Sequence, residues 1–376
     1  MKKIMISLLL MNLINVFGQN KPDHILRVYS DWITNFEKTS VDFSELIPGG
    51  PPKDGIPAIV NPKFESNQSA SDWVSEREPV ISLEINGEAK AYPLQILMFH
   101  EIANDQLGGK YVLVSFCPLC YSAIIYDREF DSEVHRFGVS GLLRNSDLVM
   151  YDQKTESFWE QFTGEAIVGE MLGKKLEPIP SQIISFEQFV EMYPDGKILS
   201  KETGFNRPYG KNPYTGYDDI DKSPFAFTGE IDDRLPPNEK VIAVKINDEY
   251  KAYPYSITWT TRVINDEFNG EKIVVFHLDG AVSSMDEREI AKSKEMGSTG
   301  VYNRIINGRE LTFRIENRKI IKDDQTNSTW SITGKAIEGD LKGEQLKKEF
   351  HGDYFSFALF AFEPDTEIYI PEESND

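Results

Sequence analysis

The chain has 376 residues, of which 40% are hydrophobic and 27% charged, a composition typical of a globular protein. Its length favours two domains over one core. Asp and Glu total 61 against 40 Lys and Arg, so the formal net charge is −21. An acidic surface repels phosphate backbones and anionic lipids, which argues against nucleic acid or a membrane surface as a partner.

The N-terminus predicts export. Lys2 and Lys3 precede a mostly apolar run over 4–17, and Gly18 offers a small residue for cleavage. This layout is that of a secretory signal peptide, assigned to residues 1–19, with an uncleaved anchor as the alternative. No other segment is long and apolar enough to span a bilayer. We therefore expect a periplasmic or extracellular mature chain without a membrane span, where disulfides are permitted.

Two parts of the chain resemble each other. Residues 80–105 match residues 241–266, and Lys90-Ala91-Tyr92-Pro93 recurs as Lys251-Ala252-Tyr253-Pro254, 161 residues later. Residues 152–169 match residues 323–339, and 184–195 match 355–366 more loosely. Matches in the same order predict an internal repeat. We assign a first repeat domain to 50–200 and a second, degenerate one to 235–370, joined by an arm over 201–234.

The first repeat opens with a predicted hairpin. The alternating run VISLEI at 80–85, the turn pair Asn86-Gly87 and a strand into Pro93 indicate it. Helical spacing over 94–105 predicts a helix that begins after Pro93. Strands are expected at 111–116, 121–127, 135–141 and 146–152, and a helix at 185–193. The fold class is α+β, with β-rich antiparallel sheets, a few helices and a tandem duplicated domain.

The connecting arm is rich in Pro, Gly and Tyr. Its aromatic residues Tyr209, Tyr214 and Tyr217 argue against disorder. Long loops in compact proteins are often functional. The arm is therefore expected either to pack the two domains together or to form a flap over a site.

The second repeat lacks the reactive residues of the first. At the same offset, positions 100, 117 and 120 hold His, Cys and Cys in the first repeat, but Thr261, Leu278 and Ala281 in the second. The joint loss of these three residues is expected if His100, Cys117 and Cys120 form one site. Independent drift of each position is the alternative.

The segment Cys117-Pro-Leu-Cys120 allows three chemistries. A structural disulfide across four residues closes a short loop and stabilises little. A redox pair would use Cys117 as the attacking thiolate and Cys120 as the resolving thiol, with His100 tuning the thiol. The third chemistry is a metal site.

A metal site would combine two thiolates with His100, ligands suited to copper or zinc. His135 and Met150 could complete the set, although a strand histidine and an apolar strand methionine are more often structural. The charges in Arg144-Asn145-Ser146-Asp147 serve either a turn or a cleft lining near the sulfurs. Walker, Rossmann and Gly-x-Ser-x-Gly motifs do not occur in the sequence.

With these motifs in view, the chain resembles a bacterial family catalogued as domain of unknown function 3179. The resemblance rests on DGIPAIVNPKF (54–64), AYPLQILMFHEIAND (91–105), FCPLCYSAIIYDRE (116–129), residues 137–169 and the closing segment 204–219. It implies export, and some related sequences are candidate selenoproteins, which would favour thiol redox chemistry. It implies no assigned activity.

The leading hypothesis is an exported thiol–disulfide oxidoreductase-like protein with catalytic Cys117, Cys120 and His100, acting on an unknown redox partner. The alternative is a copper- or zinc-binding or delivery protein that uses the same three residues. A non-catalytic binding module, in which the acidic surface and the aromatic arm engage a partner, is the third interpretation. The sequence identifies neither the substrate nor the oligomeric state.

Overall fold

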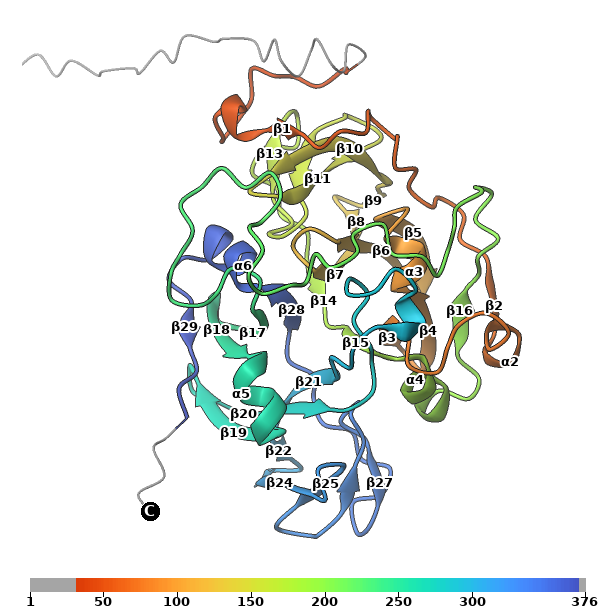
Figure 1. Ribbon diagram of the computed structural model, residues 1–376, viewed down its shortest axis with the longest axis vertical. Helices are drawn as coiled ribbons and strands as arrows, with labels where there is room; N and C mark the ends of the chain where they lie inside the picture. The colour runs from red at the N-terminus through yellow and green to blue at the C-terminus, as the bar shows by residue number, and fades with distance from the viewer. Residues whose placement is uncertain (1–31, 372–376) are drawn as a thin grey trace, which may run out of the picture.

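The structure is a computed structural model and describes residues 32–371 (Figure 1). The proposed signal peptide, 1–19, lies outside the described residues. Strands dominate, mostly in antiparallel pairs, and the five α-helices of the described part are at most seven residues long. The expected β-rich α+β class is confirmed. Within 32–371, none of these helices has the length and apolarity needed to cross a membrane.

The first half of the chain contains most of the elements near the cysteines. In chain order they are η1 (Phe43–Glu45), β1 (Ile47–Pro48), β2 (Phe64–Ser66), α2 (Asn67–Ala70), β3 (Pro79–Ile85), β4 (Glu88–Pro93), α3 (Leu94–Leu97), β5 (Ile102–Leu107), β6 (Lys110–Cys117), β7 (Ser122–Asp127), β8 (Glu129–Phe130), β9 (Glu133–Val134), β10 (Phe137–Arg144), β11 (Asp147–Asp152), β12 (Phe158–Glu160), β13 (Ala166–Val168), β14 (Pro178–Ile179), β15 (Gln182–Ser185), α4 (Phe186–Met192) and β16 (Lys197–Leu199).

The remaining elements follow the arm. They are β17 (Lys240–Ile246), β18 (Glu249–Pro254), α5 (Tyr255–Thr261), β19 (Val263–Phe268), β20 (Glu271–Leu278), η2 (Ile290–Lys292), β21 (Ser298–Asn303), β22 (Ile305–Ile306), β23 (Arg309–Glu310), β24 (Phe313–Glu316), β25 (Ile320–Asp323), β26 (Thr329–Trp330), β27 (Ala336–Glu338), β28 (His351–Phe355), α6 (Ser356–Phe362) and β29 (Glu367–Ile368).

Three sheets organise the first half. Their strand orders are β15-β3-β4-β16-β2, β14-β7-β6-β5 and β1-β10-β11-β12-β13. The predicted first hairpin is β3–β4, and Asn86 (φ 52°) and Gly87 (φ 82°) adopt the positive φ values that a tight hairpin turn requires. The strands expected at 111–116, 121–127, 135–141 and 146–152 correspond to β6, β7, β10 and β11.

The helix predicted over 94–105 is wrong beyond its first turn. Helix α3 ends at Leu97, and Glu101 takes a left-handed conformation (φ 56°) that α-helix cannot continue. The following residues form β5, which pairs along its whole length with β6. Strand pairing with a buried neighbour therefore overrides the helical spacing. The helix expected at 185–193 is present as α4.

The second half repeats several contacts of the first. Tyr92 donates a 2.8 Å hydrogen bond to Asp105, which also binds Lys90 at 2.7 Å. Trp159 donates to Asp152 at 3.1 Å. The corresponding partners in the second half are Tyr253, Asp266, Lys251, Trp330 and Asp323. These polar residues hold strands together in both halves.

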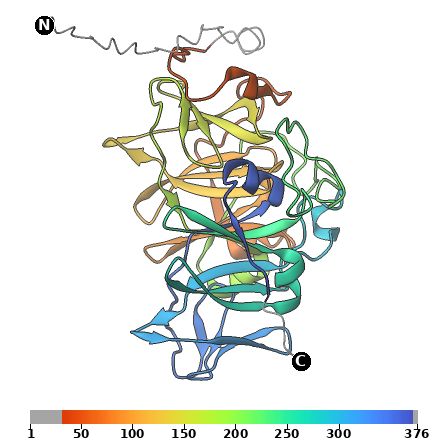
Figure 2. The same ribbon diagram turned by 90° about the vertical axis from the view of Figure 1, so that its left-hand side faces the viewer.

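The two halves pack closely. Figure 1 shows the β10–β11 sheet at one end, the β24–β25 sheet at the other, and the β3–β4 and β17–β18 sheets between them; Figure 2 shows the same stack from the side. Gln182 of β15 donates to the carbonyl oxygens of Thr299 and Ile332, at 2.9 and 3.2 Å. One hydrophobic cluster includes residues from both halves, such as Ile81 and Phe355. The halves therefore share part of their core.

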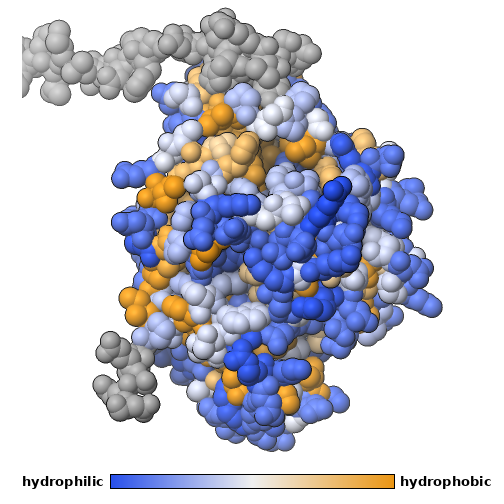
Figure 3. Space-filling model, viewed as in Figure 1, coloured by the Kyte–Doolittle hydropathy of each residue, from blue (hydrophilic) through white to orange (hydrophobic). Residues whose placement is uncertain are grey.

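The arm over 201–234 has no regular secondary structure. Tyr209, Tyr214 and Tyr217 nevertheless pack against the shared hydrophobic cluster. The face shown in Figure 3 is largely hydrophilic, with apolar residues gathered near its top and along its left edge. The arm also contacts the second half, where the side chain of Asn212 donates to the Glu287 carbonyl at 3.1 Å. The arm is thus ordered and packs against both halves.

Candidate functional site

The two cysteines lie on either side of the turn between β6 and β7. Cys117 is the last residue of β6, and Cys120 comes just before β7. The register pairs Cys117 with Ser122, and Tyr121 (φ 55°) closes the turn. Both thiols are free and only 1% and 0% exposed. The turn therefore buries a pair of reduced sulfurs at a strand end.

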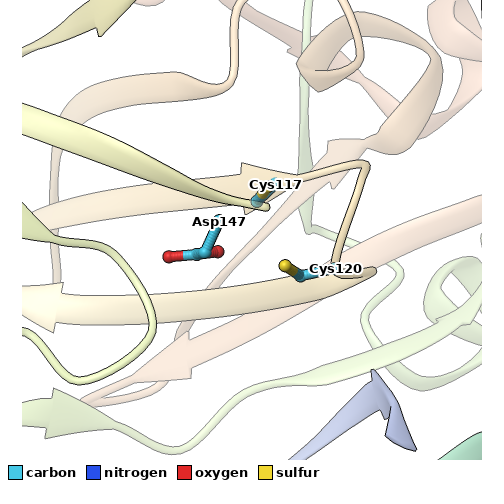
Figure 4. A group of neighbouring side chains, drawn as sticks. All are labelled: Cys117, Cys120 and Asp147. Carbon is cyan, nitrogen blue, oxygen red and sulfur yellow. The ribbon is translucent and has the colours of Figure 1, made fainter. Parts of the chain in front are cut away.

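Asp147 supplies the third polar group of this site. It follows the two-residue turn Asn145-Ser146 that joins β10 to β11. One carboxylate oxygen of Asp147 and both sulfur atoms lie within 4.8 Å of one another. Figure 4 shows the three side chains gathered around the end of the β6–β7 turn. The thiol of Cys117 also donates to the carbonyl oxygen of Ser146 at 3.8 Å.

Both alternatives for the Arg144–Asp147 segment therefore hold in part. Arg144 and Asp147 face each other across the turn, and Asp147 lies beside the sulfurs. Arg144 points to Glu45 and Glu160 instead, at 2.7 and 2.5 Å. Asp147 could be suspected from the sequence, but nothing there identified it as the residue nearest the cysteines.

The site is strongly acidic for a buried region. Burial, and then the charge of Glu160, raise the pKa of Asp147 to about 8. Burial and the charge of Asp147 raise the pKa of Glu101 to about 8 as well. Burial also raises the pKa of both thiols, that of Cys120 well above its ordinary value. In residues 32–371 no Lys or Arg forms an ion pair with Asp147 or Glu101, so both carboxyl groups hold their protons to a higher pH than usual.

Glu101 was not predicted as a site residue. Its backbone N–H bonds the Leu97 carbonyl at 2.6 Å, and its own carbonyl accepts from Phe116 at 2.8 Å. These bonds fix Glu101 where α3 gives way to β5, next to the strand that ends in Cys117. Its position directly after His100 was the only sequence signal for it.

A cavity of about 490 Å³ adjoins the cysteine turn. Leu119 of the turn, Glu101 and the arm residues Tyr214 and Tyr217 contribute to a lining that is otherwise mainly apolar. The arm is held there because Ser146 donates to the Phe225 carbonyl at 2.5 Å. The arm therefore packs on the core and contributes to the lining of this cavity.

His100 does not belong to the group of three donors. Its Nδ1 lies 2.7 Å from the Pro57 carbonyl and its Nε2 lies 2.6 Å from the Tyr209 hydroxyl. Burial lowers the pKa of His100. With both ring nitrogens engaged, His100 joins the first sheets to the arm, and Asp147 takes the place beside the sulfurs that the sequence assigned to His100.

The two secondary candidates lie elsewhere. His135 stacks on Phe130 with ring centroids 3.8 Å apart, beside the β8–β9 hairpin. Met150 is fully buried, opposite Val139 and Trp159 in its sheet. His135 does not belong to the donor group that contains the sulfurs. Met150 lies in the hydrophobic cluster that also contains both cysteines.

The second half contacts the cysteine turn through Phe355. The backbone N–H of Phe355 donates to the carbonyl oxygen of Cys120 at 3.0 Å. Phe355 is the last residue of β28 and also packs against Tyr121 with ring centroids 5.7 Å apart. The site of the first half is therefore built against a strand of the second.

The comparisons with known proteins give one match. A family model described as Protein of unknown function (DUF3179) matches residues 53–366. No curated protein and no solved structure matches the chain.

Proposed function

This chain belongs to the DUF3179 family, and from that premise we propose that it is a metal-binding protein that holds a zinc or copper ion between Cys117, Cys120 and Asp147. The convergence of two thiols and a carboxyl group in one buried site carries the proposal. Metal–sulfur bonds are about 2.3 Å long and metal–oxygen bonds about 2.0–2.2 Å. Donor atoms within 4.8 Å of one another can therefore reach a common ion with small side-chain movements.

The charge of the site supports a cation. Two thiols and two carboxyl groups are buried together, and burial raises the pKa of each. Ionising them in a metal-free site would place uncompensated negative charges in a region of low polarity. A divalent ion removes that cost because it pairs with the ionised donors. Thiolates suit zinc or copper better than magnesium or calcium.

Burial also favours metal binding over thiol–disulfide exchange. An attacking cysteine is normally accessible and has a lowered pKa. Here Cys117 is 1% exposed and the pKa of its thiol is raised, mainly by burial. His100, the expected tuning residue, is bound to Pro57 and Tyr209 instead. Exchange would first require the arm to move.

The residues suggest what the ion would do. Three protein donors leave one position of a four-coordinate ion open, as in catalytic zinc sites. Zinc in such a site polarises a bound carbonyl or water, whereas copper exchanges an electron. Glu101 lines the adjoining cavity. Its carboxyl group can donate a proton to a bound molecule when protonated, or accept one when ionised. The apolar lining would admit a small, largely apolar ligand and limit the access of water.

Elemental analysis and thiol counting on one sample test this proposal. Protein purified without chelator should contain about one equivalent of zinc or copper, and both thiols should be unreactive until the metal is removed. Cys117→Ser and Asp147→Asn should each lose most of the metal. Glu78→Gln changes a buried carboxyl group outside the donor group and should keep it. Metal-free protein with a Cys117–Cys120 disulfide would support the redox alternative.

We also infer that the chain contains a tandem duplication. The matched sequence segments and the matched tyrosine–aspartate–lysine and tryptophan–aspartate contacts support it. The repeat domains would cover 50–200 and 235–370, with the arm over 201–234 between them. The second copy has lost the cysteines and serves as a support for the first.

Export is the remaining part of the proposal. The basic, apolar and small-residue sequence of 1–19 supports a cleaved signal peptide. Mass spectrometry of the protein isolated from its native host would locate the mature N-terminus. A mature chain that begins at Met1 would contradict cleavage.

A further inference from the structure

A second cavity, of about 470 Å³, lies beside the β8–β9 hairpin. It shares no lining residue with the cavity at the cysteine turn. Its lining residues are Tyr111, Arg128, Val134, His135, Arg136, Gln153 and Lys154. Three permanent cations in one cavity stand out in a chain with a formal net charge of −21.

Arg128 is built into the wall of this cavity. It is 7% exposed, and backbone carbonyl oxygens hold its guanidinium. Nε lies 3.2 Å from the Val112 oxygen, Nη1 lies 2.8 Å from that of His135, and Nη2 lies 3.1 Å from that of Asp105. A guanidinium has five N–H groups, so these contacts leave one on each terminal nitrogen. The positive charge itself meets no carboxylate.

Other charges near Arg128 do not neutralise it. Burial, and then the like charge of Arg136, lower the pKa of Arg128. Within residues 32–371, neither arginine forms an ion pair. Lys154 forms an ion pair with Glu133 of β9. Asp105 is already bound by a lysine and a tyrosine of β4. The charge of Asp105 acts in the opposite direction on the pKa of Arg128 but does not offset burial and Arg136. The two arginines therefore form a cationic pair that makes no ion pair with a carboxylate of the described residues.

The second half shows how such an arginine is neutralised. Arg304 follows β21 as Arg128 follows β7, and its Nη1 donates to the carbonyl of Leu311 at 3.0 Å. Its Nη1 also binds the carboxylate of Glu310 at 2.5 Å. The matching position of the first half, next to His135, holds Val134. Figure 2 shows the two hairpins, β8–β9 and β22–β23, projecting from the same side of the molecule.

His135 adds a polar group to the same wall. It is 3% exposed, and neither ring nitrogen has a hydrogen-bond partner among the described residues. One face of its ring is covered by Phe130. A buried polar side chain without a partner is uncommon in folded proteins and is normally satisfied by water or a ligand.

We propose that this cavity binds a small molecule through an oxyanion, a phosphate or carboxylate group, held by Arg128 and Arg136. Arginine suits this role because its planar fork matches two oxygens of either group. Tyr111 and Val134 supply contacts for an organic part of the ligand. The site is separate from the proposed metal centre and does not depend on it.

Isothermal titration calorimetry at low ionic strength tests the site, with inorganic phosphate and succinate as probes of the full chain. We expect one equivalent of at least one probe to bind. Arg136→Gln should weaken it at least tenfold, because Arg136 is exposed and holds no other charge of the described chain. Val134→Glu should weaken it as strongly, because it gives Arg128 the carboxylate that Glu310 gives Arg304. Val134 is 43% exposed, so this change should not disturb folding.

Arg309→Gln, on the matching hairpin of the second half, is the control and should leave binding unchanged. Binding of phosphate alone assigns a phosphoryl ligand, and binding of succinate alone a carboxylate ligand. The proposal is overturned if neither probe binds saturably, or if wild type, Arg136→Gln and Val134→Glu bind equally. Cys117→Ser should keep the oxyanion site, so failure here and failure of the metal proposal are distinguishable.

Discussion

Nε2 of His100 and the hydroxyl group of Tyr209 lie 2.6 Å apart, and this contact joins the end of α3 to the arm that covers the cysteine site. The Tyr209 hydroxyl also lies 2.6 Å from Oγ1 of Thr203 in the same arm. His100 thus holds the arm against the first half through Tyr209. It can stabilise the cysteine site in this way without contacting the sulfurs.

Removing this fastening should expose the thiols. Tyr209→Phe loses the hydrogen bond to His100, and we expect a loss of about 1 kcal/mol in the free energy of unfolding. We also expect faster alkylation of Cys117 by iodoacetamide in metal-free protein, followed by mass spectrometry. Tyr253→Phe removes a comparable bond to Asp266 in the second half. This control should cost more stability, about 1.5–3 kcal/mol because Asp266 is charged, and still leave alkylation unchanged. Equal acceleration of alkylation in both variants would contradict a local cover.

Metal binding should release protons. Because burial raises the pKa of both thiols, and that of Asp147 to about 8, all three donors are mainly protonated at pH 7. An ion needs them deprotonated, so uptake should release about three protons per ion at pH 7. Fewer protons should be released as the pH rises past 8, because Asp147 is then already deprotonated before the ion binds. Calorimetry in buffers of different ionisation enthalpy measures this number. Asp147→Asn, which should bind the ion only weakly, should release about one proton fewer per ion bound when saturated with metal. No release from the wild type at pH 7 would rule out binding by these donors.

Glu78 should make stability depend on pH. Burial raises its pKa from 4.5 to about 7 in the folded protein, despite hydrogen bonds from Ser75 and Gln95. The folded chain keeps a proton that the unfolded chain loses, so the free energy of unfolding falls as the pH rises from about 4.5 to about 7. Glu78→Gln should remove up to about 3 kcal/mol of this decline. Urea unfolding across this pH range tests it, with the exposed Glu187→Gln as the control; parallel curves for all three proteins would be the contrary result.

Gly164 should tolerate no side chain. Its φ is +72°, and a Cβ atom would lie 2.6 Å from the Tyr126 ring. Gly164→Ala should therefore lower the free energy of unfolding by about 2–5 kcal/mol, from backbone strain and overpacking together. Gly87 has a φ of +82° but open space around it, so Gly87→Ala isolates the backbone effect. Its cost should be only about 1–2 kcal/mol in the same urea titration. Equal losses would show that the tyrosine can move aside.

The strands of the first half could be predicted from the sequence because their pattern is local. The alternation around Asn86-Gly87 marks the first hairpin, and β6 leads into Cys117 as expected. The apolar spacing after Pro93 predicted a helix, but the residues of β5 that carry this spacing pair with β6 as a strand. Local spacing does not reveal which segment a strand will pair with.

The site could be predicted only in part, for a related reason. The sequence singled out Cys117 and Cys120, whose contrast with the second repeat is visible in the chain. It placed His100 beside them, whereas His100 is met by Tyr209, more than a hundred residues later. Asp147 belongs to β11, which lies in a different sheet from β6 and β7, yet its side chain lies beside the sulfurs. Such contacts depend on how sheets stack, which a single sequence does not record.

The link between Phe355 and Cys120 uses main-chain atoms alone. Substitution of either side chain leaves the amide and the carbonyl in place, with proline at 355 as the one exception because it has no N–H. The second half therefore contacts the cysteine turn through atoms that do not depend on the identity of its side chains. We expect excision of the second half to disturb the cysteine turn, although the second half contributes no functional side chain to it.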